Sequence, residues 1–386
     1  MNPSIWTQFQ RFAELSVDAL DQARANGRRI AGIYCIFAPV ELIRAAGAVP
    51  VGLCGKQQAP IAAAEESLPT ALCPLIKSSY GYAVTNTCPF FEASDFIVGE
   101  TTCDGKKKMF ELMGRLKSLH LMQLPYNQDR PEALAYWHSE VLRLKAFLEE
   151  QTGNRIEADA LNYEIRLHNR MRQAFQKLMT LNGCGQEPIN GMRFLPVLES
   201  KGFAVDLESY VGLLDALYQE TAGASRKEDP GTGRPRILLT GTPLGKGSEK
   251  LLRLIEDAGA VVVAMENCTG IKSCYQLVDE NDPDPVRAIA RHYLDTPCAC
   301  MTPNNRRTGL IRQLIDELDV DGVVDMAWQC CHPYEIESAS LRPSIYAAGR
   351  VPCIHISTDY SESDTGQLAV RIEAFLIMLE ISGYSA

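Results

Sequence analysis

Hydrophobic runs alternate with helical periodicity in the first third of the chain. Apolar side chains recur near a 3.6-residue period from Trp6 to Leu20, which predicts an N-terminal helix. Short apolar runs then predict four strands, at residues 32–35, 47–53, 95–98 and 119–124. Helices are expected between them, at residues 40–46 and 102–117. This alternation indicates a parallel sheet that is covered by helices.

The rest of the chain divides at a Gly- and Pro-rich stretch. From residue 131 to about 218 the pattern is helical, and Trp137, Val141 and Leu148 lie on one apolar stripe. Residues 228–235 are dense in Gly and Pro, which predicts a linker. A second αβ unit follows, with strands expected at residues 237–240, 261–265, 322–326 and 353–357 and a last helix at 366–379.

These elements predict an α/β protein with two Rossmann-like domains that have parallel sheets and are joined by a helical segment. The expected N-terminal domain spans residues 1–130, the helical segment and linker 131–234, and the C-terminal domain 235–386. In such sheets, binding sites form where loops converge at the carboxyl ends of strands. We therefore expect the functional site in the cleft between the two domains.

Composition narrows the choice of partners. The 386 residues are 46% hydrophobic and 22% charged, and the formal net charge is −10. An acidic chain argues against binding to nucleic acid or to anionic membranes. No run of 18 apolar residues predicts a membrane span, and the N-terminus lacks a signal-peptide pattern. We therefore expect a cytoplasmic protein whose thiols are reduced.

The chain nevertheless carries 13 cysteines. An odd, high count in a reducing compartment favours metal binding or redox catalysis over disulfides. The alternative is that these thiols are small buried hydrophobic side chains, and we expect this for about half of them.

The position of the cysteines supports a metal centre. Most follow a predicted strand or begin a helix, and two lie in the Pro-flanked stretch PCACMTPN: the candidates are Cys35, Cys73, Cys103, Cys268, Cys298, Cys300 and Cys331. There is no CxxC pair of the kind that structural zinc sites use, and the candidates exceed the four ligands of one zinc. Thiolate-rich sites of this kind favour iron–sulfur clusters. We expect His332 to pack or to donate a hydrogen bond to sulfur rather than to act as a ligand.

Two further motifs have ordinary interpretations. The stretch GTPLGKGS at residues 241–248 fails the Walker pattern, so a tight strand-to-helix turn is expected. The basic run 106–108 is expected to be a solvated face, and the alternative is a docking patch for an acidic electron donor or for a nucleotide-tailed substrate.

Six stretches carry a resemblance to a known family: YCIFAPVELIRAAGAVPVGLC, LCPLIKSSYG, GETTCDGKKKMFE, ENCTG, PCACMTPN and QCCHPYEIES. They resemble the 2-hydroxyacyl-CoA dehydratase and benzoyl-CoA reductase family, and most of all its branch of double-cubane cluster proteins. The resemblance covers nearly the whole chain and is weakest from about residue 127 to 234.

The resemblance implies particular ligands. In the dehydratases, a subunit of this kind holds one [4Fe-4S] cluster through three cysteines, which correspond to Cys73, Cys103 and Cys331. The double-cubane branch holds an [8Fe-9S] double-cubane cluster through six thiolates. The three additional ligands would be Cys35, Cys268 and Cys300, with Cys298 as the substitute for Cys300. Cys330 adjoins Cys331 and is expected to lie beside the cluster without being a ligand. Five further cysteines match no ligand motif and are assigned to packing: Cys54, Cys88, Cys184, Cys274 and Cys353.

The resemblance also implies a function. Adding an electron to so electron-rich a centre is unfavourable, and the family uses a separate ATP-hydrolysing activator with its own iron–sulfur cluster. The chain is thus expected to be a homodimeric, anaerobic oxidoreductase that reduces a small molecule, for example one with a triple or an N–N bond. His332 and Tyr334 are the candidate proton donors, and the runs 106–108 and 306–307 are candidate docking patches for the activator.

Two alternatives stay open. The first is a 2-hydroxyacyl-CoA dehydratase subunit with a single [4Fe-4S] cluster, which would perform a radical dehydration with a partner subunit. The surplus of cysteines beyond three argues against it. The second is an electron-storage or cluster-carrier protein without catalysis, which would bind iron and sulfide but oxidise no substrate.

Overall fold

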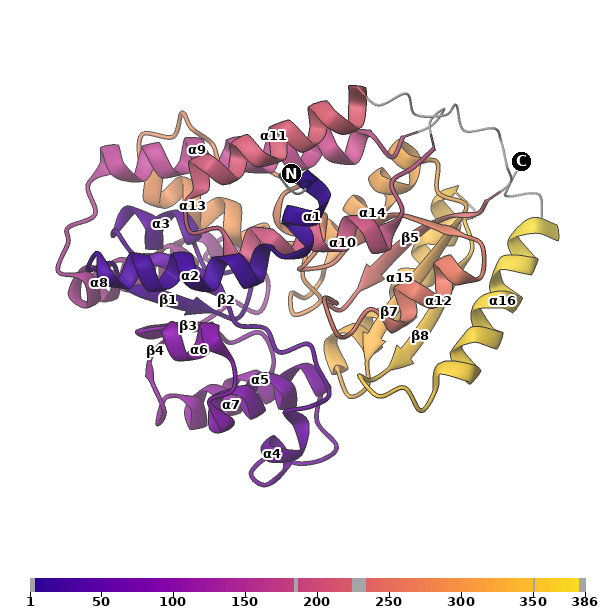
Figure 1. Cartoon of the computed structure of the whole chain (residues 1–386), viewed down its shortest axis with the longest axis horizontal. Coiled ribbons are helices and arrows are strands. Elements are labelled where there is room, and N and C mark those ends of the chain that lie inside the picture. Colours follow the sequence, from indigo (N-terminus) through magenta and orange to yellow (C-terminus); the bar gives the residue numbers. More distant parts are fainter. Residues whose placement is uncertain (1–3, 184–186, 224–233, 350, 382–386) are drawn as a thin grey trace.

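The protein has two parallel four-stranded sheets that lie side by side (Figure 1). The computed structural model describes residues 4–183, 187–223, 234–349 and 351–381. The first sheet contains β1 (Ile30–Ile33), β2 (Val49–Gly52), β3 (Phe96–Glu100) and β4 (Ser118–Met122). The second contains β5 (Arg236–Gly241), β6 (Val261–Glu266), β7 (Gly322–Trp328) and β8 (Cys353–Thr358). The predicted α/β class is confirmed.

Both sheets have the same strand order. The first runs β2-β1-β3-β4 and the second β6-β5-β7-β8, and every pair is parallel. In each sheet the second strand lies on one side of the first strand, and the later strands lie on the other side. The strand order therefore switches between β1 and β3 in the first sheet, and between β5 and β7 in the second. Loops diverge at such a switch point and leave a crevice beyond the carboxyl ends of the strands.

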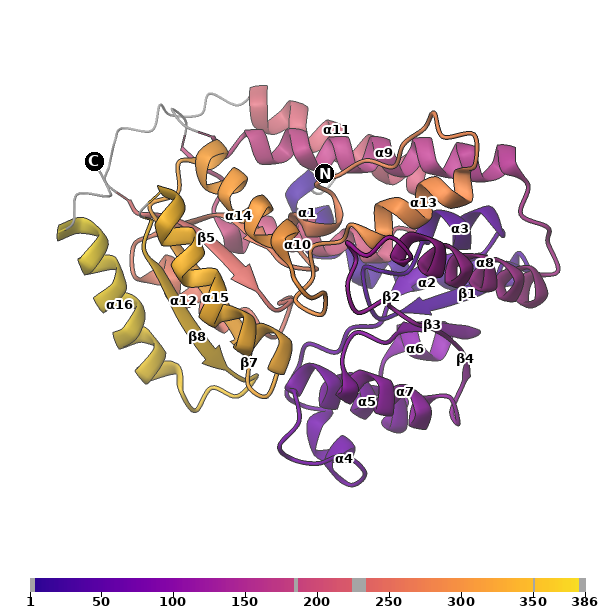
Figure 2. The same ribbon diagram turned by 180° about the vertical axis from the view of Figure 1, so that it is seen from behind.

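Helices cover both faces of each sheet. In the N-terminal half these are α1 (Ile5–Gln10), α2 (Phe12–Ala25), α3 (Val40–Ala45), α4 (Ile61–Glu65), α5 (Pro74–Thr85), α6 (Pro89–Ala93) and α7 (Asp104–Met113). The C-terminal half has α12 (Lys250–Asp257), the 3-10 turn η2 (Ile271–Ser273), α13 (Pro285–Leu294), α14 (Asn305–Leu318), α15 (His332–Gly349) and α16 (Thr365–Ile381). On the second sheet, α12 and α16 lie together on one face and α14 and α15 on the other (Figures 1 and 2).

A helical segment connects the two halves. It comprises α8 (Ala133–Thr152), α9 (Ala158–Thr180), α10 (Gly191–Ser200), the turn η1 (Lys201–Phe203) and α11 (Leu207–Gly223). The long helices α9 and α11 pack along one edge of the molecule (Figure 2). Helix α13 follows β5 and β6 of the second sheet in sequence, yet it packs against α8 of the connecting segment, which in turn packs against β4 of the first sheet. The two halves are thus interlocked by helices as well as joined by the chain.

The strand predictions agree with the structure to within a few residues, because buried parallel strands are continuous apolar runs. All six residues of β5 and all seven of β7 are buried. The predicted N-terminal helix is broken at Arg11 into α1 and α2, and α7 is shorter than the helix expected at 102–117. The expected linker lies outside the described residues as far as position 233. Within the described part of the chain, no helix is long and apolar enough to cross a membrane.

Candidate functional site

A large cavity lies between the two sheets, at the carboxyl ends of their strands. Its volume is about 1470 Å³, which exceeds the range of roughly 300–1000 Å³ that is usual for small-molecule pockets. Nine of the twelve described cysteines line it: Cys35, Cys54, Cys73, Cys103, Cys268, Cys298, Cys300, Cys330 and Cys331. The structure thus brings all seven predicted ligands to one cavity. Cys54 and Cys330, which were not predicted to be ligands, also line the cavity. Cys184 lies outside the described residues.

Three of these thiols share a local geometry. Cys73 and Cys103 are the N-caps of α5 and α7, and Cys331 immediately precedes α15. Backbone N–H groups in the first turn of the following helix lower the pKa of each thiol, although neither N-cap sulfur makes a capping hydrogen bond. A helix N-terminus stabilises a thiolate through these N–H groups and the helix dipole. We call Cys73, Cys103 and Cys331 the helix-cap group.

The members of the helix-cap group also act on one another. Cys331 donates a hydrogen bond to the sulfur of Cys73, and this bond lowers the pKa of Cys73. The same bond, together with burial and the charges of Cys73 and Cys103, raises the pKa of Cys331 well above its ordinary value. Burial raises the pKa of Cys103, and the charge of Cys73 adds to the shift. The three sulfurs therefore lie within electrostatic range of each other.

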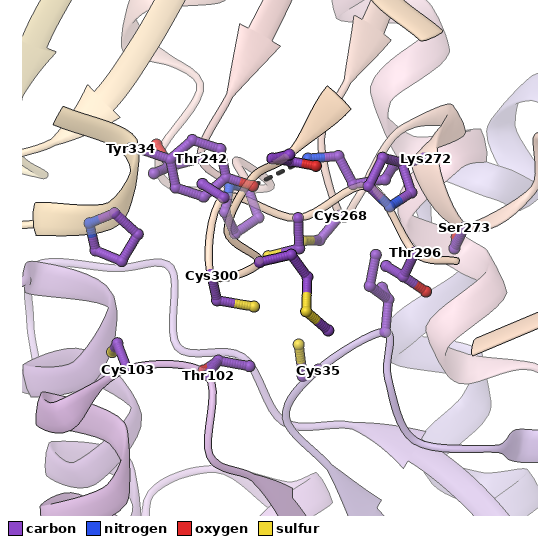
Figure 3. Close-up of a pocket in the computed structure, with 18 of the residues that line it drawn as sticks. Cys35, Thr102, Cys103, Thr242, Cys268, Lys272, Ser273, Thr296, Cys300 and Tyr334 are labelled. Atoms are coloured by element: carbon purple, nitrogen blue, oxygen red, sulfur yellow. Dashed lines mark hydrogen bonds between the residues drawn. The ribbon is translucent and has the colours of Figure 1, made fainter. Parts of the chain in front are cut away.

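The remaining candidates, Cys35, Cys268, Cys298 and Cys300, form a second set that we call the loop group. Cys35 lies two residues beyond β1 and Cys268 two residues beyond β6, whereas Cys298 and Cys300 come from the loop between α13 and α14. Figure 3 shows Cys35 from the first half facing Cys268 and Cys300 from the second.

The loop group is also electrostatically connected. The hydrogen bond with Cys300 lowers the pKa of Cys298 to about 6, against the effect of burial. That bond, burial and the charges of Cys298, Cys35 and Cys268 raise the pKa of Cys300 well above its ordinary value. Burial raises the pKa of Cys268 to about 12. The seven thiols thus fall into two sets, one of three and one of four.

Three lysines line this thiol-rich cavity: Lys106 and Lys272 are buried, and Lys201 is half-buried. Lys106, at the start of α7, is 8% exposed and donates to the carbonyl oxygen of Tyr34 at 3.1 Å. Lys201 donates only to carbonyl oxygens, among them that of Gly270 at 3.0 Å. Lys272 is 3% exposed, and its ammonium pairs with Glu266 at 3.0 Å. The sequence offered no signal that separated these lysines from solvated ones.

Two of the docking-patch residues prove to be buried, so that prediction is wrong for them. Lys106 points into the protein, while Lys107 and Lys108 face solvent and pair with Asp104 and Glu111 of their own helix. Arg307 is fully buried and is not among the residues that line the cavity. Its guanidinium forms ion pairs with three carboxylates, those of Glu266, Asp325 and Glu337.

The two candidate proton donors occupy different environments. His332 is exposed at the start of α15, whereas Tyr334 is 6% exposed. Both line the cavity. The Tyr334 hydroxyl accepts a hydrogen bond from Lys272 at 2.9 Å, drawn as a dashed line in Figure 3. Its own hydrogen has no acceptor among the described residues, so Tyr334 can donate it to a molecule in the cavity.

The residues around the cavity fit an anionic iron–sulfur centre. The seven candidate thiols line one cavity. Among the described residues, no group of three Cys, His, Asp or Glu side chains is placed to hold a single metal ion. The ammonium groups of Lys106 and Lys201 make no ion pair with a described carboxylate, although Lys106 is buried and Lys201 is half-buried. Burying a charge is costly unless an opposite charge lies nearby. Thiolates and sulfide in the cavity would supply that charge.

The architecture defines the class: an α/β protein of two Rossmann-like halves with a cysteine-lined cavity between them. The chain belongs to the family described as 2-hydroxyglutaryl-CoA dehydratase, D-component, which matches residues 35–379. The family resemblance seen in the sequence is therefore confirmed. Its named relatives are subunits of dehydratases and of a reductase, so this is a family of enzymes.

Named relatives extend over most of the chain. A protein of Escherichia coli, provisionally named dehydratase subunit YjiM, is 42% identical over 380 residues, 98% of each chain. The beta subunit of (R)-2-hydroxyglutaryl-CoA dehydratase from Acidaminococcus fermentans is 22% identical over 378 residues, 95% of this chain and 97% of that one. A benzoyl-CoA reductase subunit from Thauera aromatica is 22% identical over 242 residues, 61% of this chain and 60% of that one.

Proposed function

We propose that this protein binds an [8Fe-9S] double-cubane cluster and is a reductase that receives low-potential electrons from an ATP-hydrolysing activator. The division of the lining thiols into the helix-cap group and the loop group is the observation that carries the proposal. Two joined cubanes require two sets of ligands, whereas a single [4Fe-4S] cluster would need the helix-cap group alone. When bound, such a cluster supplies low-potential electrons to a small molecule in the cavity.

The ligand assignment follows the two groups. Cys73, Cys103 and Cys331 would hold one cubane through thiolates that helix N-termini stabilise. Cys35 and Cys268 would hold the other, together with one member of the Cys298 and Cys300 pair. The loop bearing this pair comes from the half opposite to Cys35, so the second cubane would be enclosed by both halves.

Tyr334 is the better candidate of the two for proton donation. A proton donor must lie within hydrogen-bond reach of the group that it protonates. Tyr334 lies inside the cavity, accepts from Lys272, and keeps its own hydrogen available. His332 is exposed and can exchange protons with solvent, which suits a supply role at the cavity mouth better.

The proposal can be tested by activator-dependent turnover. The anaerobically purified protein is mixed with an activator from this family, ATP and a strong reductant, and is then exposed to acetylene or hydrazine as probes for triple and N–N bonds. We expect ATP-dependent reduction of the cluster, followed by reoxidation on addition of a probe. Reduction without reoxidation by any probe would favour the electron-storage alternative.

Ligand variants provide the matched test of the two groups. The triple variant C35S/C268S/C300S should retain the helix-cap cluster of about four irons, while C353S serves as the control. Cys353 lies outside the cavity lining, on β8. An unchanged iron content in the triple variant would contradict ligation by the loop group. The single variants C298S and C300S identify which member of that pair is the ligand.

The second candidate function is that of a 2-hydroxyacyl-CoA dehydratase subunit. The names of the relatives favour it, as does the volume of the cavity, which exceeds that of usual small-molecule pockets. A thioester arm could occupy that space if only one cluster were bound. Addition of a 2-hydroxyacyl-CoA to the reduced protein distinguishes the two functions: formation of an enoyl-CoA indicates the dehydratase, and its absence alongside acetylene reduction indicates the reductase.

We also propose that the protein is a cytoplasmic homodimer. Light scattering of the purified chain tests the oligomeric state, because a dehydratase subunit would instead need a different partner chain. A monomer that is fully active with its activator would contradict the homodimer.

A further inference from the structure

Lys106 occupies an unusual position for a residue in a run of three lysines. It lies in the first turn of α7, three residues after Cys103, and its side chain turns inward while Lys108 turns outward. Its ammonium reaches the loop of Cys35 and donates to the carbonyl oxygen of Tyr34 at 3.1 Å. One side chain therefore joins the helix that begins at a helix-cap cysteine to the loop that carries a loop-group cysteine.

The charge of Lys106 acts on thiols of both groups. It lowers the pKa of Cys73 and opposes the rise at Cys103 in the helix-cap group. It also opposes the effect of burial on the pKa values of Cys35 and Cys268 in the loop group. Lys272, by contrast, acts on Cys268 and Cys298, which both belong to the loop group. Lys106 thus lies near the boundary between the two groups.

The protein itself leaves this charge uncompensated. Lys106 makes no ion pair with a described carboxylate, and its ammonium lies over the ring of Phe110 at 5.8 Å from the centroid. Glu100, at the end of β3, is the one carboxyl among the main influences on the pKa of Lys106. It is fully buried, and neither of its oxygens has a hydrogen-bond partner among the described residues. Burial raises the pKa of Glu100 to about 8, so this group is mostly neutral at pH 7.

We infer that Lys106 is a positioning residue whose positive charge stabilises the added electron at the junction of the two cysteine groups. This inference rests on the proposed double-cubane cluster. A buried cation interacts strongly with nearby negative charge because little water screens it. Reduction adds one negative charge to an already anionic centre, so a fixed ammonium beside both ligand sets makes the reduction less unfavourable.

The test compares variants in the cluster-loaded protein. K106M removes the charge with little loss of volume, K106R retains the charge, and K108M removes an exposed lysine of the same helix that is 75% exposed at the side chain. Iron and sulfide content is measured first, and the midpoint potential of the cluster is then measured by a titration followed by electron paramagnetic resonance. We expect K106M to lower the equilibrium constant for one-electron reduction at least tenfold, which corresponds to about 59 mV, while K106R and K108M keep the wild-type potential.

The outcomes separate this inference from the proposed function. Wild-type iron content of about eight per chain with an unchanged potential in K106M would overturn the role of Lys106 alone. Loss of the cluster in both K106M and K106R would overturn it as well, because shape rather than charge would then matter. Loss in K106M with retention in K106R would support it. A wild-type protein with about four irons has no junction between two clusters, and both proposals would fall.

Discussion

Replacing Arg307 by methionine should destabilise the protein by about 3 to 5 kcal/mol. The guanidinium is fully buried and lies 3.3 Å from both Glu266 and Asp325, and it also pairs with Glu337. At an effective dielectric constant of about 20, each 3.3 Å contact corresponds to about 5 kcal/mol of Coulomb attraction. The free-energy cost of desolvating Arg307 offsets part of this Coulomb attraction. Lys272 still pairs with Glu266 in the variant, which limits the loss further.

The neighbouring residue Arg306 offers a matched control. Its side chain is 31% exposed and pairs with Asp129 and Asp295, so R306M should cost less than about 1 kcal/mol. Thermal unfolding of the iron-free proteins, followed by far-ultraviolet circular dichroism, makes the comparison. At about 2 °C per kcal/mol, R307M should melt roughly 6 to 10 °C below the wild type and R306M within about 2 °C of it. Equal shifts for the two variants would refute the argument that burial of the ion pairs sets the difference.

Three other predictions concern the cavity and its supports. Because burial holds the pKa of Glu100 at about 8, against 4.5 for the free group, the folded protein binds more protons than the unfolded chain between these values, and its stability falls as the pH rises. Denaturant titrations should show that E100Q loses about 3 kcal/mol less free energy of unfolding than the wild type between pH 5 and pH 8. The same pH dependence in both proteins would contradict this. Y334F should lower substrate-dependent turnover by about 100-fold without changing the cluster content, and H332F should lower it less. A turnover rate of Y334F equal to that of the wild type would exclude Tyr334 as the proton donor. At Gly241 a Cβ would lie 1.9 Å from a backbone oxygen, whereas at Gly259 it meets open space, so G241A should lower the soluble yield and melting temperature far more than G259A.

The sequence was informative about the fold because the strands are buried on both faces. Continuous apolar runs mark β5 and β7 without knowledge of their neighbours. The pattern did not predict that α13 packs against α8 beside the first sheet, because this is a tertiary contact that no local period records. The break at Arg11 was missed because apolar residues keep their period across it.

The sequence predicted which cysteines line the cavity, but not which basic side chains are buried. Placement after predicted strands was enough to gather Cys35, Cys103 and Cys268 at one rim, because the carboxyl ends of parallel strands meet at the same edge. Lys106 and Arg307, however, each lie next to a more exposed basic residue, and composition cannot tell which member of such a run turns inward. That choice depends on the residue at which the helix begins: Cys103 caps α7, so the helical phase carries Lys106 toward the cavity.

The content of iron and acid-labile sulfide per chain, measured on anaerobically purified wild-type protein, tests the central claim most directly. Two groups of cysteine ligands around one cavity predict about eight irons and about nine sulfides. About four irons and four sulfides would contradict the double cubane and would leave the loop group without a ligand role.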